Sequence, residues 1–532
     1  MLTGLTFETA QPPAAAAPNR ADVACFIGMV ARRPRVALPA GVRAQLRGTG
    51  WIGGPWNLAA ARVADLWQLP VVVDAWDTFD RLFAWETRPV RADPVRADGE
   101  TRCTGYLGAA VRSFFAHGGR RAVVIRAGDP WPYLGGPDRV AARRARLAAL
   151  VPAMAEASLP FDATDPRTWR GIEHLYGLPE VSHVCIPDLA DACAAEPPEL
   201  PVVNPPPPAP EVFVECSPNE PSLPDDSGLR FVAAPRLDPD GFAAWASTVA
   251  AVRDFLARHR RDALLVASIP LPRADARAPV FGGTHAQGDF LGFLRQCGVL
   301  EAEGVNEAGG GTAASAFLQL GWPWLQTTRS DDLPQRLEPA EGLLAGVLAE
   351  NALARGTFRS VAGSRLPQVV ALEPVPDLGL GSDSPTARLA ERVCLIGPEP
   401  DGMAVLSDVT SAPDRDWRAG GVSRLMATLL RAARRVGEAE LFEASGPELW
   451  TRIRRSLEDL LDGFLRAGAF GGRGRVEAFQ VRCDRSTMSQ NDLDHGRLRV
   501  EITVLPAAAI ERITVSLELA AGGAESRLSE VA

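Results

Sequence analysis

Apolar and polar side chains alternate most regularly near the C-terminal end of the chain. Every second position is apolar in three segments, 479–484, 497–504 and 513–519. A period of two is typical of a strand with one buried face. The pattern predicts three half-buried strands, the last of which precedes a Gly/Ser/Glu-rich segment, 520–532, that we expect to be a flexible tail. The apolar positions of the last strand are Ile513, Val515, Leu517 and Leu519.

A helix is predicted ahead of these strands. Ser445 and Glu448 have the spacing of a capping box, with a hydroxyl at the expected N-cap and a carboxylate three residues later. Gly468 is a typical C-terminal stop. Between these signals the apolar residues recur at helical spacing. They are Leu449, Ile453, Leu457, Leu460, Leu461 and Phe464.

The preceding part of the chain alternates helix and strand patterns, which predicts an α/β (α+β mixed) multidomain protein. Residues 1–20 are rich in Ala and Pro and have no clear period, so we interpret them as an extended arm. The proline-dense segment 197–210 is unsuited to a central strand or helix. The predicted strands are 23–30, 69–73, 122–126, 184–189 and 263–268. The predicted helices are 57–69, 106–115, 252–258, 313–320 and 342–355, with a helical turn at 77–83.

The composition argues against several classes of function. The 532 residues are enough for roughly two to four domains, and the net charge of -9 argues against nucleic acid or an anionic membrane as the main partner. We find no apolar run of the roughly 18 residues that a membrane span needs. The eight cysteines are scattered, which indicates reduced core residues of a cytoplasmic protein. The chain contains no lysine, which excludes enzymes that depend on a P-loop, kinase or Schiff-base lysine.

One motif favours a nucleotide-dependent enzyme as the alternative function. Residues 48–53 read G-T-G-W-I-G, and a predicted helix and the strand 69–73 follow before Asp74. This is the spacing of a dinucleotide-binding loop, in which glycines let a pyrophosphate reach a helix N-terminus. However, the preceding segment 42–47 is too polar for a strand covered on both faces, and Gly54-Pro55 favours a loop. We therefore interpret Gly48, Gly50 and Gly53 as loop residues.

The remaining candidate motifs are weaker. Gly309–Thr312 before the expected helix 313–320 could hold an anion, and Asp484 to Gly496 superficially resembles a calcium loop without its alternating ligands. His285 and Asp289 could form a base and its orienting partner, but no matching nucleophile accompanies them. Trp322 and Trp324 favour core or interface packing over a sugar-binding platform. The sequence thus predicts no catalytic residue, no cofactor site and no metal site.

A family resemblance lies in the C-terminal segment. Residues 417–425, W-R-A-G-G-V-S-R-L, resemble the W-R-x-x-x-V-x-R-L element of contractile tail sheath proteins, which occur in phages and phage-tail-like injection particles. Further elements follow in the family's order: L-F-E at 441–443, L-W-x-x-I-R at 449–454, E-A-F-Q-V-R-C-D at 477–484 and Q-N-D-L-D-H-G-R-L at 490–498. The matching positions are Trp417, Arg418, Arg424, Glu443, Trp450, Arg454, Asp484, Asn491, Asp492 and Gly496.

Elements outside the C-terminal segment resemble the same family. They include the helix, glycine stop and strand of 106–126, the strand 184–189 and the helix beginning at Gly342. The resemblance implies an N-terminal arm, 1–20, and an inserted α/β domain, 21–365, whose segment 195–310 is variable and faces outward. It further implies a C-terminal domain, 366–519, in which residues 507–519 exchange a strand with a neighbouring subunit.

The resemblance implies a structural protein with no enzymatic activity. Such a subunit polymerises as stacked hexameric rings around an inner tube and contracts to drive the tube through a target envelope. Its partners would be its own copies, the inner tube protein, and baseplate and cap proteins, with no nucleic acid and no direct membrane insertion. It would assemble in the cytoplasm within a particle that is then released or kept inside the cell. A monomeric binding module is the third class left open.

Overall fold

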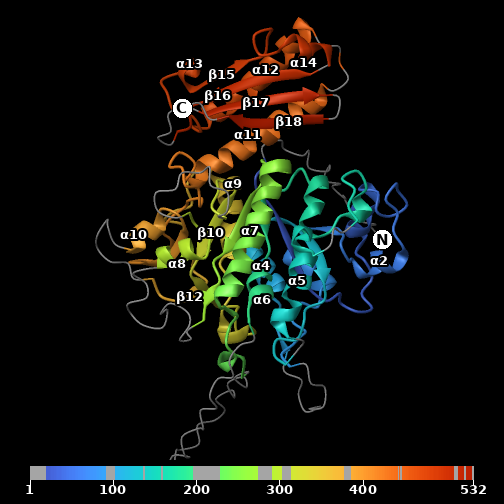
Figure 1. The fold of residues 1–532 in the computed structure, drawn as a ribbon, viewed down its shortest axis with the longest axis vertical. Helices are drawn as coiled ribbons and strands as arrows, with labels where there is room; N and C mark the ends of the chain where they lie inside the picture. The colour runs from blue at the N-terminus through green and yellow to red at the C-terminus, as the bar shows by residue number, and fades with distance from the viewer. Residues whose placement is uncertain are drawn as a thin grey trace, which may run out of the picture. The chain divides into compact units, whose positions relative to one another are not determined.

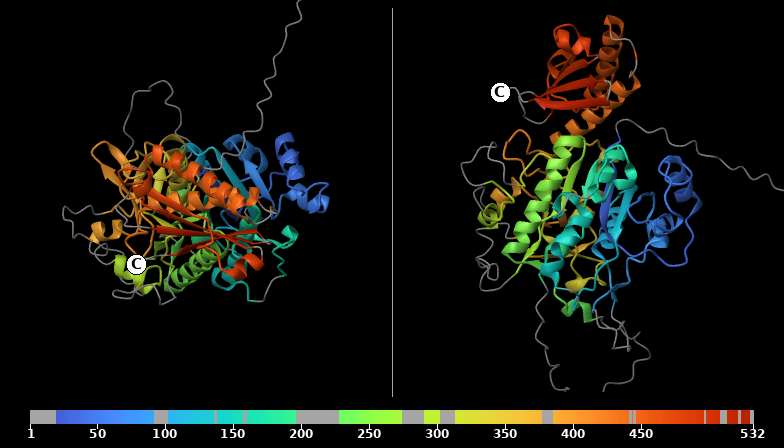
Figure 2. Two further views of the ribbon diagram at one scale, coloured as in Figure 1. Left: turned by 90° about the horizontal axis from the view of Figure 1, so that it is seen from above. Right: turned by 45° about the vertical axis from the view of Figure 1, so that its right-hand side comes forward.

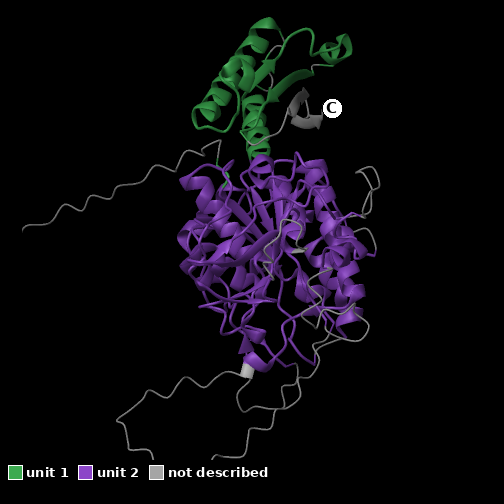
Figure 3. Cartoon of the chain, turned by 90° about the vertical axis from the view of Figure 1, so that its left-hand side faces the viewer, with its two compact units in different colours: residues 1–21, 425–532 green, residues 22–424 purple. Residues whose placement is uncertain are grey.

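The computed structural model describes residues 20–91, 102–135, 138–156, 160–195, 228–273, 290–301, 313–376, 385–440, 443, 446–495, 497–507, 513–520 and 523–529. The chain forms two compact units (Figure 3). The large unit spans 22–424, and the C-terminal unit takes in the described residues after Arg424 and before Asp22. The division falls inside helix α11, Gly420–Ala439.

The large unit (Figure 1) is built on an eight-stranded sheet, whose strand order is β14-β13-β10-β8-β6-β1-β5-β2. Its six inner strands run parallel, while the edge strands β2 and β14 are antiparallel to their neighbours. The strands are β1 (Val23–Met29), β2 (Pro70–Val73), β5 (Arg121–Gly128), β6 (His183–Cys185), β8 (Leu264–Ser268), β10 (Leu318–Trp322), β13 (Cys394–Glu399) and β14 (Gly402–Val405).

Helices cover both faces of this sheet. The helices of the large unit are α1 (Ala40–Gly48), α2 (Ala60–Asp65), α3 (Trp76–Leu82), α4 (Tyr106–Ala116), α5 (Arg139–Leu150), α6 (Leu189–Cys193), α7 (Pro239–His259), α8 (Phe290–Gln296), α9 (Glu341–Ala354) and α10 (Pro385–Ala390). Small two-stranded pairs complete it: β3 (Arg88–Pro89) with β4 (Arg102–Cys103), β7 (Arg236–Leu237) with β9 (Leu271–Pro272), and β11 (Trp324–Thr327) with β12 (Val369–Glu373).

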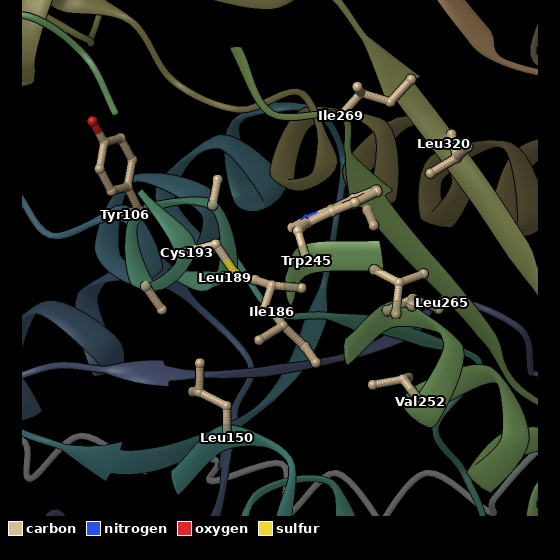
Figure 4. Close-up of a cluster of buried hydrophobic side chains, with 14 of the residues drawn as sticks. Tyr106, Leu150, Ile186, Leu189, Cys193, Trp245, Val252, Leu265, Ile269 and Leu320 are labelled. Carbon is tan, nitrogen blue, oxygen red and sulfur yellow. The ribbon is translucent and has the colours of Figure 1, made fainter. Parts of the chain in front are cut away.

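Two apolar cores lie on opposite faces of the sheet, and strand β1 contributes to both. Val23, Cys25 and Ile27 belong to the core that includes α5, α6 and α7, part of which Figure 4 shows. Ala24 and Phe26 belong to the other core, which includes α3, α4 and α9. A parallel strand covered on both faces reads as a continuous apolar run, which explains the sequence V-A-C-F-I-G-M.

The C-terminal unit is a four-stranded antiparallel sheet, ordered β15-β16-β17-β18, with a long helix packed on it. Helix α12, Pro447–Arg466, buries the five apolar side chains Leu449, Ile453, Leu457, Leu461 and Phe464. Phe470 lies between α12 and the sheet, with ring centroids 6.3 Å from Phe464 and 6.1 Å from Phe479. The strands are β15 (Phe479–Arg482), β16 (Leu498–Val504), β17 (Ile513–Ala520) and β18 (Gly523–Ser529), and the short helices are α13 (Arg475–Ala478) and α14 (Gln490–Asp494).

The periodic segments form the elements that their patterns predict. Strands β1, β2, β5 and β8, the helices α4, α9 and α12 and the alternating burial of β15 and β16 are confirmed. Helix α2 is shorter than expected because it ends at Asp65, where Leu66 adopts a left-handed backbone. Helix α7 is longer than expected because its N-terminus is capped by Asp238. Six of the seven described cysteines are buried.

Four local expectations are wrong. The strand expected at 184–189 ends at Cys185, and helix α6 begins at Leu189. Residues 313–317 are not helical and lead into strand β10, since a buried run of apolar residues does not by itself distinguish strand from helix. Gly446, rather than Ser445, is the N-cap of α12, because Pro447 takes the first helical position. The segment expected to be a flexible tail contains strand β18, which pairs with β17 from Thr514↔Ser529 to Ala520↔Gly523.

The division between units also differs from the expected boundary at 366. Residues 366–424 lie in the large unit because β13 and β14 extend its central sheet. Motif similarity does not measure compactness, so the family's C-terminal elements begin at a different place from the C-terminal unit. The expected arm 1–20 and the proline-dense segment 197–210 fall almost wholly outside the described residues. Within the described part of the chain, no helix is long and apolar enough to cross a membrane.

Candidate functional site

A buried ion pair fixes the first turns of helix α11. Arg424 donates from Nη2 to Asp408 Oδ2 at 2.6 Å and from Nη1 to Asp408 Oδ1 at 2.8 Å. The exposed fractions of the two side chains are 2% and 0%. Burial opposes ionisation of Asp408, but the charge and hydrogen bonds of Arg424 outweigh it and hold the pKa of that carboxyl below its usual range.

The ion pair belongs to a larger polar cluster in the large unit. Arg424 Nε donates to the carbonyl of Thr357 at 3.1 Å, and Nη2 donates to the carbonyl of Arg359 at 3.2 Å. Asp408 accepts from the backbone N–H of Val361 and from Gln319 Nε2, both at 3.0 Å. With both charges hydrogen-bonded on several sides, the pair meets the condition under which a buried ion pair is tolerated.

The two glycines of the 417–425 motif allow this close approach. A Cβ atom at Gly420 would lie 2.2 Å from Asp408 Oδ1, and one at Gly421 would lie 2.3 Å from the carbonyl oxygen of Phe358. Both distances are far below van der Waals contact. The motif's glycines are therefore required by packing at the start of α11.

Trp417 and Arg418 hold the turn that leads into α11. The carbonyl of Trp417 accepts from Thr410 Oγ1 at 2.6 Å. Arg418 donates to the carbonyls of Ala412 and Pro413, at 3.2 and 2.7 Å. Residues 417–425 therefore form one structural unit. Hydrogen bonds hold its turn, and the buried ion pair holds the helix that follows. The sequence identified Arg424 but not its partners Asp408 and Gln319, because both lie outside the motif.

The other motif positions lie in surface turns and on helix faces of the C-terminal unit. Asp484 Oδ1 accepts from the N–H of Ser486 at 2.7 Å. Asp492 and Ser489 cap the start of α14 reciprocally, a capping box that the S-x-x-D spacing could have revealed. The remaining positions are Glu443, 3.7 Å from Arg452; Arg454, 3.9 Å from Glu458; Trp450 on α12; Asn491 on α14; and Gly496, which lies outside the described residues.

The strand expected to join subunits pairs with β16 of the same chain. The register runs from Leu498↔Leu519 to Val504↔Ile513, so every apolar position of β17 lies opposite a buried apolar residue of β16. Those β17 positions are Ile513, Val515, Leu517 and Leu519. Strand β17 thus has a complete partner in this single chain, and strands β15 and β18 form the two edges of the sheet.

The glycine-rich segment 48–53 lacks the geometry of a dinucleotide site. Gly48 is the last residue of helix α1, so a helix, not a strand, precedes the loop. Gly50 and Gly53 have φ values of +82° and +65° and form a turn, in which the N–H of Gly53 donates to Asn57 Oδ1 at 2.9 Å. Asp74 follows an edge strand antiparallel to β5 and lies 3.5 Å from Arg121. The loop therefore does not lead from a strand into the N-terminus of a helix, which is the arrangement that binds a pyrophosphate.

The other candidate motifs have structural roles or lie outside the described residues. The rings of Trp322 and Phe290 stack with centroids 4.5 Å apart, and Trp324 Nε1 donates to the carbonyl of Ile269 at 2.9 Å, so both tryptophans pack in the core. Residues 309–312, His285 and Asp289 are outside the described residues. Among the residues that are described, no group of His, Cys, Asp and Glu side chains is arranged to hold a metal ion.

No protein-family model matches the sequence, and no curated protein sequence is detectably similar to it. Solved structures, however, share its fold over almost its whole length. A chain of the anti-feeding prophage (AFP) helical sheath in the contracted state aligns with a TM-score of 0.51 and 16% identity, covering 96% of this chain and 97% of that one. The chain has a contractile sheath fold.

A second alignment gives the same result. A chain of the anti-feeding prophage baseplate in the contracted state aligns with a TM-score of 0.53 and 17% identity, with 96% of each chain covered. The alignment covers 96% of this chain, so the likeness in fold is not confined to the segment that carries the C-terminal motifs. The resemblance found in the sequence motifs is confirmed at the level of the fold.

Proposed function

We propose that this protein is the structural sheath subunit of a contractile, phage-tail-like injection particle. The proposal rests on the likeness in fold to the AFP helical sheath chain, which extends over 96% of this chain. The ordered motifs in 417–498 support the same function from the sequence. The part of the structure built from these motifs is stabilised by the buried Arg424–Asp408 ion pair, by close glycine contacts and by the capping box of α14.

The finer features of the proposal follow from the family resemblance. Copies of the chain form hexameric rings that stack helically around an inner tube, with baseplate and cap proteins at the two ends. Contraction releases a metastable extended arrangement into a more stable one, as a two-state element does. The particle assembles in the cytoplasm and acts inside or outside the producing cell.

Strand exchange is the proposed link between subunits. Strand β16 presents seven residues to β17, and the pairing depends on backbone hydrogen bonds and one apolar face. An identical β17 from a neighbouring subunit can make the same contacts in the same register, because the partner's sequence is the same. Such a link is directional and can survive rigid-body movement of the subunits.

Electron microscopy of the full-length protein tests the proposal. Expressed with its neighbouring genes and negatively stained, the protein should form hollow cylinders with a helical surface, and a fraction of them should enclose a tube. A monodisperse monomer at every concentration and salt condition would contradict the sheath function and favour a binding module. Saturable binding of a nucleotide would instead favour the enzyme alternative.

A further inference from the structure

Helix α5 buries a row of arginines against the body of the large unit. Arg139, Arg143 and Arg146 lie on one helical face, with exposed fractions of 4%, 7% and 9%. Arg88 of strand β3, exposed by 2%, joins them. Arginine is almost never fully buried unless it is paired. Four buried guanidinium groups in one cluster therefore require an account of their counter-charges.

The carboxylates of the described residues do not balance this cluster. Asp191 is shared, since it lies 2.6 Å from Arg88 and 2.9 Å from Arg139. Asp238 lies 3.7 Å from Arg143, but its Oδ1 also accepts the Gly241 N–H at the start of α7. A third carboxyl, Asp188, caps the N–H of Met29, and its burial raises its pKa to about 7. Among the described residues, the four arginines therefore have fewer ionised carboxylates beside them than positive charges at neutral pH.

Two of the arginines also have unused hydrogen-bond donors. Arg143 Nε, Arg143 Nη2 and Arg146 Nη1 are buried and have no hydrogen-bond partner among the described residues, and Nη2 is the Arg143 atom that lies 3.7 Å from Asp238. The Arg146 guanidinium instead stacks on Trp131, with Cζ 4.2 Å from the ring centroid. Burial and the charges of Arg139 and Arg88 lower the pKa of Arg146 to about 10, although Asp191 opposes this change. A buried donor without an acceptor destabilises the folded state, and the effect is larger when the group is charged.

We propose that a small oxyanion of the phosphate or sulfate class binds beside α5, held by Arg143 and Arg146. Side chains three positions apart on a helix are neighbours, with about 5–6 Å between their Cβ atoms. Their unused N–H groups can therefore converge on one tetrahedral anion, and guanidinium groups match the spacing of its oxygen atoms. A water molecule could accept the hydrogen bonds, but it would leave the excess charge unbalanced.

The proposed site is independent of the sheath function. Arg143, Arg146 and Asp191 all belong to the large unit, and none of them is part of the α11 motif or of a C-terminal strand. The bound anion would stabilise the large unit in the same way as any ligand that binds only the folded state. Binding and assembly can therefore be measured separately, and failure of one leaves the other unaffected.

Isothermal titration of the full-length protein with sodium phosphate tests the proposal. Ionic strength is held constant with the sodium salt of a bulky sulfonate buffer, and chloride and sulfate are titrated in parallel. We expect one phosphate per chain and a saturable rise in the thermal midpoint. Arg143→Met and Arg146→Met should each weaken binding by about tenfold or more, because each removes charge-assisted hydrogen bonds.

Arg144→Met is the matched control. Arg144 adjoins Arg143 on the same helix, but its side chain is 72% exposed and pairs with Glu156 at the surface. This variant loses the same charge and should bind phosphate like the wild type. The proposal is overturned if the wild type shows no saturable binding, if only chloride binds, or if all three variants bind phosphate equally. The wild-type titration decides the question even if a buried-arginine variant does not fold.

Discussion

Arg424 and Asp408 face each other in a bidentate ion pair, with N···O distances of 2.6 and 2.8 Å and almost no exposure to solvent. Arg424 is the last residue of the large unit, and helix α11 continues from it into the C-terminal unit. The pair therefore fastens the start of that helix to the large unit. Its two members are only 16 residues apart, but the groups that surround them come from segments up to 105 residues away.

Removing one member of this pair should strongly destabilise the large unit. Asp408→Asn leaves the Arg424 charge buried without its counter-charge, which costs about 3–5 kcal/mol in comparable pairs. Denaturant titration measures this loss as a decrease in the free energy of unfolding. Asp401→Asn is the control, because Asp401 and its partner Arg365 are each 70% exposed and such a pair contributes at most about 1 kcal/mol. Equal losses in the two variants would contradict the anchoring role.

Stability of the large unit should fall as the pH rises toward 8. Burial raises the pKa of Asp188 and of Glu338 to about 7 and that of Glu341 to about 8. Between about pH 4 and these values the groups are ionised in the unfolded chain but protonated in the folded one, so each contributes up to about 1.4 kcal/mol of destabilisation per pH unit. The effect is absent below about pH 4 and complete above the folded pKa values.

The pH effect can be assigned to one residue. In the wild type the Ser268 N–H donates to Glu341 Oε2 at 2.6 Å. Glu341→Gln keeps an oxygen acceptor for this N–H and removes the titrating group. The free energy of unfolding should therefore differ less between pH 5 and pH 8 in this variant than in the wild type. Glu350→Gln, on the exposed end of the same helix, should keep the wild-type difference. A Glu341→Gln variant with undiminished pH dependence would refute the assignment.

Deleting residues 508–532 should abolish assembly and leave the large unit folded. The deletion removes β17 and β18, and with them the strand that is proposed to pair with a neighbouring subunit. Circular dichroism checks the fold, and negative-stain microscopy checks for cylinders. Deleting only residues 530–532, which follow β18, should preserve assembly. Normal cylinders from the longer deletion would show that this strand does not link the subunits.

Residues 197–210 should be the first site of proteolysis in assembled particles. The segment is proline-dense and is expected on the outward-facing side, away from the inner tube. Limited digestion followed by mass spectrometry identifies the first cut. The unassembled protein serves as the comparison, since both forms should be cut there at similar rates. Protection of this segment upon assembly would place it at an interface between subunits.

The wild-type protein should give no saturable heat when titrated with nicotinamide or flavin dinucleotides. The 48–53 turn follows helix α1 and does not aim a helix N-terminus at a phosphate. Gly50→Ala is the comparison variant, and it should behave like the wild type in the titration. If the wild type binds a dinucleotide at micromolar concentration and Gly50→Ala does not, the 48–53 turn is a nucleotide site and the enzyme alternative is favoured.

Local periodicity was sufficient to predict many of the elements. The alternation in 479–484 and 497–504 is reproduced in the burial of β15 and β16, and the helical spacing of 449–464 matches the buried face of α12. Strand β18 was missed because its sequence, G-A-E-S-R-L-S, has little apolar alternation. It forms by pairing along β17, and a pairing partner is not visible in the pattern of a single segment.

The sequence by itself determined the periodic elements, the family motifs and the absence of lysine chemistry, because each depends on neighbouring residues or on composition. Only the tertiary structure decided which charges meet. Arg424 contacts Asp408 and Gln319, which lie outside its motif, and three arginines of α5 are buried, one of which pairs with Asp191. Burial and charge pairing depend on contacts between distant parts of the chain, so no local pattern could reveal them.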